Sequence, residues 1–372
     1  VSSMAEPSGS APQSALSVER STTPTSPERR AELLSAPGFG RYYTDHMVTI
    51  EWSPGQGWHD AAVRPYAPLA FDPATSVLHY GQAIFEGFKA YRQPDGGIAT
   101  FRPEANGARF QRSAARMALP ELPVELFVEA SDELVRLEQD WVPSDPETAL
   151  YLRPFMLGTE VGLGVRPSAE ALVCIIASPA GAYFAGGIKP VSLWLSEEYV
   201  RAAPGGTGAA KCAGNYAASL IAQREAGDNG CDQVVFLDAV DKKWIEELGG
   251  MNLFFVLDDG TLATPETSGT ILEGITRESL ITLAGDLGHK VDERRIDIDE
   301  WREGVASGRI TEVFACGTAA VITPVGTLKW HDGSVTTPGD GFGPVTTALR
   351  TALLDIQYGK AADRYHWLHR VV

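Results

Sequence analysis

Cysteine is scarce in this chain of 372 residues. The four cysteines, Cys174, Cys212, Cys231 and Cys316, lie far apart, and no two of them form a C-x-x-C pair. A chain of this length can bury a core without disulfide staples, so the spacing excludes a disulfide framework. It suits reduced thiols and predicts a cytoplasmic protein.

Basic charge and long apolar runs are also in short supply. The chain has 48 acidic and 31 basic residues, a formal net charge of −17, which repels phosphate backbones and anionic membrane surfaces. Apolar runs such as residues 171–177 are too short to cross a bilayer, and the first thirty residues contain no apolar core of a signal peptide. We therefore expect a globular protein that binds neither nucleic acid nor membrane.

Aromatic residues are missing from the first 38 positions, and half of the first thirty residues are Ser, Thr or Pro. Such a stretch buries too little surface to offset its ordering entropy, so residues 1–36 are predicted to be a disordered tail. Pro and Gly concentrate again in SPAGAYFAGGIKP, residues 178–190. We interpret residues 37–180 as a small N-terminal domain, 181–190 as an interdomain loop and 191–372 as a large C-terminal domain.

Apolar periodicity alternates between strands and helices in both halves. It predicts strands over residues 47–52, 149–157, 171–176, 191–195, 233–237, 251–257 and 312–315, and two strands within 87–101 joined by a turn at 94–97. It predicts helices over residues 124–141, 216–226, 277–287 and 345–356. The fold class is therefore α+β, with two α/β domains and a cleft between them.

The stretch GGTGAAKCAGNY, residues 205–216, places Lys211 among residues with very small side chains. It is not a Walker loop, because Ala210 precedes the lysine and Cys212 follows it, and no G-x-G-x-x-G dinucleotide fingerprint occurs in the chain. A flat aromatic cofactor bound covalently through the amine would require such a clearing. On spacing alone, an exposed lysine in a glycine-rich loop is the favoured alternative, since most lysines are exposed.

Two later stretches favour the cofactor. In WIEELGGMN, Glu247 leads into a buried strand, where a carboxylate is costly unless it meets a cation such as a protonated pyridine nitrogen. In EGITRESL, the free N–H groups of Ile275 and Thr276 open a helix and form an anion site that suits a phosphate.

Six strings together carry a resemblance to a known family: FEGFKAYR (85–92), YLRPF (151–155), GAYFAGG (181–187), AKCAGNY (210–216), EELGGMN (246–252) and GTAAVITPV (317–325). They resemble the branched-chain amino acid aminotransferases of bacterial type, which are fold-type IV, class IV aminotransferases that use pyridoxal 5′-phosphate. The likeness runs from about residue 39 to residue 358 in the family's order. It implies the fold-type IV architecture with the cofactor cleft between the two domains.

The resemblance implies a role for each matched cofactor residue. Lys211 would hold the cofactor covalently and move the proton between substrate and cofactor, Glu247 would keep the pyridine nitrogen protonated, and Tyr216 would bond the ring's 3-oxygen. The phosphate contacts would be Arg109, Ile275, Thr276 and Thr318. Without the resemblance, Arg109 would be taken for part of a solvated helix face, because Arg112 and Arg116 follow it at helical spacing.

The resemblance also implies a pocket that accepts both apolar side chains and glutamate. The matched substrate-binding positions are Tyr43, Tyr80, Phe85, Tyr151, Arg153, Tyr183, Thr318 and Ala319. Arg153 would meet the side-chain carboxylate of glutamate, and the backbone at Thr318 and Ala319 would receive the α-carboxylate. Core packing is the alternative for each aromatic residue taken alone.

The implied activity is the reversible, ping-pong transamination of L-leucine, L-isoleucine and L-valine with 2-oxoglutarate by a homodimer, in branched-chain amino acid biosynthesis or degradation. Rivals are D-amino acid transamination, aminodeoxychorismate lyase activity, or a protein that binds the cofactor without turnover. No metal site is expected, since His366 and His369 have no third ligand nearby in sequence.

Overall fold

The computed structural model describes residues 16–181, 189–339 and 343–372, and within them the strands form two nine-stranded sheets. In spatial order the first sheet contains β1 (Ser17–Val18), β3 (Gly57–Pro65), β2 (His46–Ser53), β8 (Ala171–Ala180), β7 (Ala149–Gly158), β5 (Phe88–Arg92), β6 (Ile98–Phe101) and β18 (Leu368–Arg370), with β4 (Ala83–Phe85) beside β7. The second contains β11 (Ile245–Leu248), β10 (Gln233–Leu237), β9 (Val191–Ser196), β16 (Val321–Trp330), β15 (Ile310–Gly317), β12 (Asn252–Leu257), β13 (Leu262–Thr264) and β14 (Val291–Glu293), with β17 (Gly333–Thr336) beside β16.

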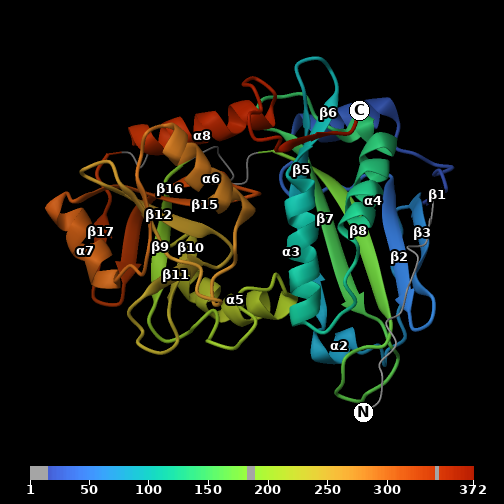
Figure 1. Cartoon of the computed structure of the whole chain (residues 1–372), viewed down its shortest axis with the longest axis horizontal. Coiled ribbons are helices and arrows are strands. Elements are labelled where there is room, and N and C mark those ends of the chain that lie inside the picture. Colours follow the sequence, from blue (N-terminus) through green and yellow to red (C-terminus); the bar gives the residue numbers. More distant parts are fainter. Residues whose placement is uncertain (1–15, 182–188, 340–342) are drawn as a thin grey trace, which may run out of the picture.

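Helices border both sheets (Figure 1). They are α1 (Pro27–Ser35), α2 (Val77–Tyr80), α3 (Pro103–Arg116), α4 (Val124–Leu137), the 3-10 turn η1 (Gln139–Trp141), α5 (Ala213–Asp228), α6 (Ile275–Asp286), α7 (Ile298–Ser307) and α8 (Pro344–Gln357). Proline opens α1, α3 and α8, where its missing N–H has no intrahelical partner to lose. No helix in the described ranges combines the length and the apolar character needed to cross a membrane.

The first sheet is mostly antiparallel, and its core lies against α3 and α4. Phe88 from β5, Phe110 from α3 and Phe127 from α4 are almost fully buried and pack ring against ring. The helix predicted over residues 124–141 stops at Leu137, and Trp141 enters the core from the 3-10 turn that follows.

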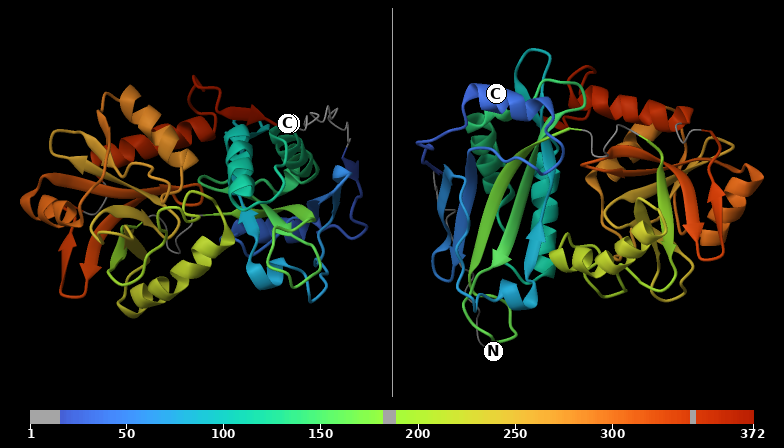
Figure 2. Two further views of the ribbon diagram at one scale, coloured as in Figure 1. Left: turned by 60° about the horizontal axis from the view of Figure 1, so that its bottom comes forward. Right: turned by 180° about the vertical axis from the view of Figure 1, so that it is seen from behind.

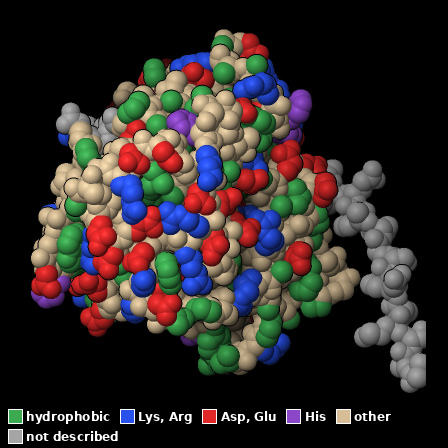
Figure 3. Space-filling view, turned by 60° about the vertical axis from the view of Figure 1, so that its left-hand side comes forward, with side chains coloured by type: hydrophobic (Ala, Val, Ile, Leu, Met, Phe, Trp, Pro, Cys, Tyr) green, Lys and Arg blue, Asp and Glu red, His purple; other side chains and the backbone are tan. Residues whose placement is uncertain are grey.

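The second sheet is mixed. Strands β9 and β10 are parallel, so the chain must cross over between them, and α5 makes that crossover. Lys211 and Cys212 immediately precede α5, and one end of α5 lies beside α3 (Figures 1 and 2). Cys212 bridges Ile84 of β4, so the lysine lies next to the first sheet. On the face shown in Figure 3, acidic and basic side chains are interspersed.

The predicted strands and helices are found, with ends that differ by a few residues, but both chain ends depart from expectation. Disorder over residues 1–36 is wrong from Leu16 onward, because β1 pairs with β3 and α1 packs Leu33 and Leu34 on the first core. The prediction that the large domain runs to residue 372 is also wrong at its end, because the C-terminal strand β18 pairs with β6 of the first sheet. Of the predicted interdomain loop, residues 182–188 lie outside the described ranges.

Candidate active site

A cavity of about 180 Å³ lies where the two sheets meet. On the side of the first sheet its walls come from β4, β7 and α3, and on the side of the second sheet from β11, β12, β15, α5, α6 and the β15–β16 turn. The residues that line it are Phe39, Phe85, Gly87, Arg109, Tyr151, Arg153, Lys211, Tyr216, Glu247, Gly250, Met251, Asn252, Leu272, Gly274, Ile275, Thr276, Cys316, Gly317, Thr318, Ala319 and Ala320.

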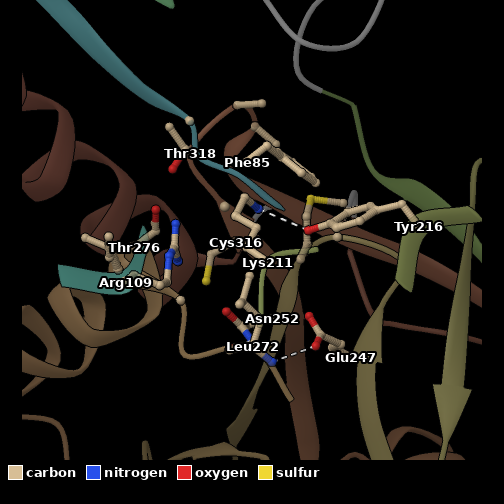
Figure 4. Close-up of a pocket in the computed structure, with 18 of the residues that line it drawn as sticks. Phe85, Arg109, Lys211, Tyr216, Glu247, Asn252, Leu272, Thr276, Cys316 and Thr318 are labelled. Carbon is tan, nitrogen blue, oxygen red and sulfur yellow. Dashed lines mark hydrogen bonds between the residues drawn. The ribbon is translucent and has the colours of Figure 1, made fainter. Parts of the chain in front are cut away.

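Lys211 lies at the centre of this cavity (Figure 4). Its Nζ lies 3.0 Å from the Tyr216 hydroxyl and 4.8 Å from the centre of the Phe85 ring. Its backbone is held on both sides, since its N–H donates to Ser113 Oγ and its carbonyl accepts from the N–H of Phe85. The alternative of an exposed surface lysine is therefore wrong.

The small residues before Lys211 serve backbone packing. A Cβ on Gly208 would lie 2.4 Å from the carbonyl oxygen of Thr270, which no side chain tolerates. Ala210 is buried in the first core. The clearing in GGTGAAK thus lets the lysine-bearing segment pass close to its neighbours.

Glu247 is a buried carboxylate on the opposite side of Lys211 from the start of α6 (Figure 4). Its Oε1 accepts the N–H of Leu272 at 2.8 Å and lies 2.9 Å from Nη1 of Arg201. Burial raises the pKa of Glu247, and the positive charge of Arg201 opposes that rise. The sequence analysis missed Arg201, because nothing in its local pattern distinguishes it from a surface arginine.

Arg109 is buried rather than part of a solvated helix face, whereas Arg112, three residues later, is largely exposed. Nε and Nη2 of Arg109 donate to the two carboxylate oxygens of Glu86, and its Nη1 donates to the backbone carbonyl of Glu273. Burial alone would lower the pKa of Arg109, but Glu86 raises it, so the charge is secure. Glu86 is a second site residue that the sequence analysis missed.

The first turn of α6 adjoins Arg109. No side chain caps this helix start, and among the described residues no partner accepts the N–H groups of Ile275 and Thr276. Gly274 lies directly before them, and a Cβ there would lie 2.0 Å from Asn252 Oδ1, so a larger residue would displace the Asn252 side chain. Unpaired N–H groups beside a guanidinium form an anion site.

These groups have the spacing of one elongated ligand. Arg109, Thr276 and Thr318 lie on one side of Lys211, while Tyr216 and Glu247 lie on the other (Figure 4). A phosphate on an aromatic ring would place its anion at α6 and its ring nitrogen near Glu247, with the amine between them. The residues present therefore fit pyridoxal 5′-phosphate.

Five of the predicted substrate residues line the cavity: Phe85, Tyr151, Arg153, Thr318 and Ala319. Arg153 donates to the hydroxyl of Tyr151 at 3.0 Å and lies over the Phe85 ring, which leaves its charge at the edge of an aromatic wall. Thr318 and Ala319 form the β15–β16 turn.

The other three predicted substrate residues are not brought together here. Tyr43 stacks on Tyr66, and Tyr80 donates to the carbonyl of Leu163; neither lines the cavity of this single chain. Tyr183 lies outside the described residues. Phe39, which the sequence analysis did not single out, lines the cavity instead.

The turn that carries Thr318 and Ala319 is held from the first sheet. Lys89 of β5 donates from Nζ to the carbonyl of Ala319 at 3.0 Å, and burial lowers the pKa of Lys89 to about 8. Val321, which ends the turn, has a φ of 62°, a strained value for a β-branched residue. The contacts around the turn therefore hold its backbone in one strained conformation, as expected where backbone groups contact a ligand.

Comparison with known proteins gives this site a family. Residues 83–328 match the family model "Amino-transferase class IV". The chain belongs to that family. It is 59% identical, over 95% of its length and 98% of the relative's, to a probable branched-chain-amino-acid aminotransferase of Streptomyces coelicolor, and 57% identical, over 95% and 97%, to the branched-chain-amino-acid aminotransferase of Mycobacterium tuberculosis H37Rv.

Solved structures of class IV aminotransferases share the fold. The Escherichia coli branched-chain amino acid aminotransferase superposes with a TM-score of 0.73 at 30% identity, covering 88% of this chain and 99% of that one. The T.th. branched-chain amino acid aminotransferase, solved with pyridoxamine 5′-phosphate, gives 0.72 at 31% identity, covering 87% and 98%. The predicted fold type, family, enzyme class and cofactor are confirmed.

The Glu86–Arg109 pair allows a test of the anion end of the site. Glu86→Gln is expected to weaken pyridoxal phosphate binding about tenfold, because Arg109 loses a charge-assisted hydrogen bond of about 1.5–3 kcal/mol that orients it. Absorbance titration of the cofactor-free protein measures the dissociation constant. Glu273→Gln is the matched control, since that carboxylate is exposed and, among the residues that the structure describes, pairs only with Arg112. Equal constants for the two variants would contradict the orienting role of Glu86.

Proposed function

We propose that this chain catalyses the reversible transfer of an amino group between L-leucine, L-isoleucine or L-valine and 2-oxoglutarate, giving branched-chain 2-oxo acids and L-glutamate. When bound, pyridoxal 5′-phosphate supplies an electron sink for the charge that develops at the substrate Cα. The observation that carries the proposal is the Lys211 amine, placed between an anion cradle and a buried carboxylate. The T.th. relative has been solved with N-(5′-phosphopyridoxyl)-L-glutamate and with 4-methylvaleric acid, which supports both substrate classes.

The proposed roles follow from the geometry. Lys211 would move the proton between the substrate Cα and the cofactor carbon that carries the transferred amino group, with the Tyr216 hydroxyl 3.0 Å away to hold the amine in place. The carboxylate of Glu247 would keep a proton on the ring nitrogen of the bound cofactor. Arg109 and the N–H groups of Ile275 and Thr276, together with Thr318, would hold its phosphate.

The substrate end combines an apolar wall with one charge. Phe85 and Tyr151 would contact a branched side chain, and the guanidinium of Arg153 at their edge would meet the side-chain carboxylate of glutamate. The α-carboxylate would lie against Thr318 and Ala319. An arginine at the edge of an aromatic wall allows the two substrate classes to share one pocket.

A homodimer is part of the proposal. The loop at residues 161–165 leaves Val161, Leu163 and Val165 between 57% and 85% exposed, and Leu78 and Tyr80 lie exposed on the neighbouring α2. Clustered exposed apolar side chains mark an interaction surface. A second copy covering this surface would bring Tyr80 toward a pocket, as its predicted substrate role requires.

The cytoplasm is the proposed location. All four cysteines are free and buried. Free thiols in every position suit a reducing compartment.

The proposal is tested by visible absorbance of the purified protein loaded with pyridoxal phosphate. Adding L-isoleucine without any 2-oxo acid is expected to remove the absorbance responsible for the yellow colour, and adding a 2-oxo acid is expected to restore it. D-alanine is the control, and bleaching by D-alanine in place of L-isoleucine would assign D-amino acid transamination instead. An unchanged spectrum with both amino acids would reject transamination.

A further inference from the structure

The N-terminal arm, residues 16–36, is docked on the first sheet. Strand β1 extends that sheet by pairing Ser17 and Val18 with Ala62 and Val63 of β3. The apolar side chains of the arm, Leu16, Leu33 and Leu34, pack on the first core. In the right-hand view of Figure 2, α1 (blue) lies at one end of the first sheet.

Two adjacent residues at the start of β2 receive the arm. Asp45 Oδ1 accepts the N–H of Thr25 at 2.9 Å and its hydroxyl at 2.7 Å. His46 Nε2 accepts the N–H of Ser21 at 2.8 Å. The arm therefore depends on two acceptors that belong to the folded body.

Asp45 and His46 also form hydrogen bonds with residues at the C-terminal end of α4 and in the 3-10 turn after it. Asp45 Oδ2 accepts Nε1 of Trp141 at 3.0 Å, and Nδ1 of His46 donates to Glu138. Because Nε2 accepts from the arm, the proton of the neutral ring lies on Nδ1. With His46 and Glu138 both buried, this tautomer presents a fixed acceptor to Ser21.

The arm ends at the substrate wall. Helix α1 stops at Ser35, and four residues later Phe39 lines the cavity with its ring edge-to-face on Tyr151, 5.1 Å between centroids. Between them, the carbonyl of Gly38 accepts the N–H of Gly181 at 2.8 Å. Tyr151 in turn holds Arg153, so the position of Phe39 affects the whole aromatic wall.

We propose that Asp45 and His46 are positioning residues that, by docking the N-terminal arm, hold Phe39 against Tyr151 and thereby set the affinity of the pocket for large apolar side chains. This inference rests on the proposed transaminase function. The groups at the cofactor end, Lys211, Glu247 and Arg109, belong to other segments. Releasing the arm therefore changes substrate affinity and leaves cofactor binding intact.

The main test is Asp45→Ala. Ser21→Pro is a second variant, which removes the N–H donated to His46 and the hydroxyl that accepts from the N–H of Thr23, both within the arm, and leaves Asp45 and His46 in place. Both are expected to expose the arm to trypsin at Arg29 and Arg30 and to raise KM for L-leucine about 3- to 10-fold, the value of one lost aromatic contact. The kcat and the pyridoxal phosphate spectrum are expected to stay near those of the wild type.

Two further variants make the result decisive. Phe39→Ala is expected to raise KM to the same extent with the arm still protected from trypsin. Glu32→Ala, which removes only the exposed pair with Arg29, is expected to change neither property. An arm that trypsin releases without a change in KM, or a KM that rises with the arm still protected in Asp45→Ala, overturns the proposal, whereas a wild-type protein without turnover rejects the transaminase function itself.

Discussion

Lys211→Ala is expected to abolish transamination while the protein stays folded. Loss of a positioned acid–base group alone lowers a rate by about 10²–10⁴-fold, and here the same amine also holds the cofactor. Truncating a lysine that borders a polar cavity opens no new apolar void, so the free energy of unfolding changes little. Steady-state rates with L-leucine and 2-oxoglutarate, together with a thermal melt, measure both effects.

Lys243→Ala is the matched control for this prediction. Lys243 lies between β10 and β11, is half exposed and pairs with Asp297. It is expected to retain wild-type turnover and, like Lys211→Ala, a melting temperature near that of the wild type. Measurable wild-type turnover in Lys211→Ala would remove the lysine from the mechanism and with it the central assignment.

Glu247→Gln is expected to lower kcat by about 10²–10³-fold, the typical effect of deleting one preorganised electrostatic contact. The substitution is conservative in shape, since the amide oxygen can still accept from Leu272 and Arg201 while the negative charge is lost. Cofactor binding through Lys211 and the anion cradle is retained. Single-turnover spectra after mixing with L-isoleucine measure the slowed step directly.

The neighbouring carboxylate supplies the control. Glu246 lies one residue earlier on β11, so its side chain points to the opposite face, where it accepts from the Thr270 hydroxyl. Glu246→Gln is expected to keep kcat within about twofold of the wild type. Equal losses of kcat in the two variants would show that the rate depends on the integrity of β11 rather than on the charge of Glu247.

Much of the site could be predicted because its signals are local. The motifs single out Lys211, Tyr216 and Glu247, which all line one cavity, and EGITRESL indicates the helix start at Ile275. Tyr43 and Tyr80 were also predicted for the pocket, yet in one chain they do not line it. A motif identifies a position in the chain but not the cavity that its side chain reaches.

The partners of the buried charges could not be predicted. Glu86 meets Arg109 across 23 positions, and Arg201 lies beside Glu247 across 46. Local sequence predicts that a charged residue is exposed to solvent. Its burial becomes favourable only when a partner from a distant segment offsets the cost, and local sequence does not reveal that partner. The prediction of disorder for the arm was wrong for a related reason. Its composition is polar overall, but three of its leucines pack on the first core, and two of its N–H groups donate to Asp45 and His46.

The sequence by itself determined the alternation of strands and helices, the glycines where backbone segments approach closely, and the order of the cofactor-binding motifs. These are short-range properties, set by side-chain periodicity and backbone sterics within a few residues. The tertiary structure alone decided which charges are paired, that the C-terminal strand joins the first sheet, and that Phe39 lines the cavity. Those outcomes depend on contacts between segments far apart in the chain, whose energies arise only when the fold brings them together.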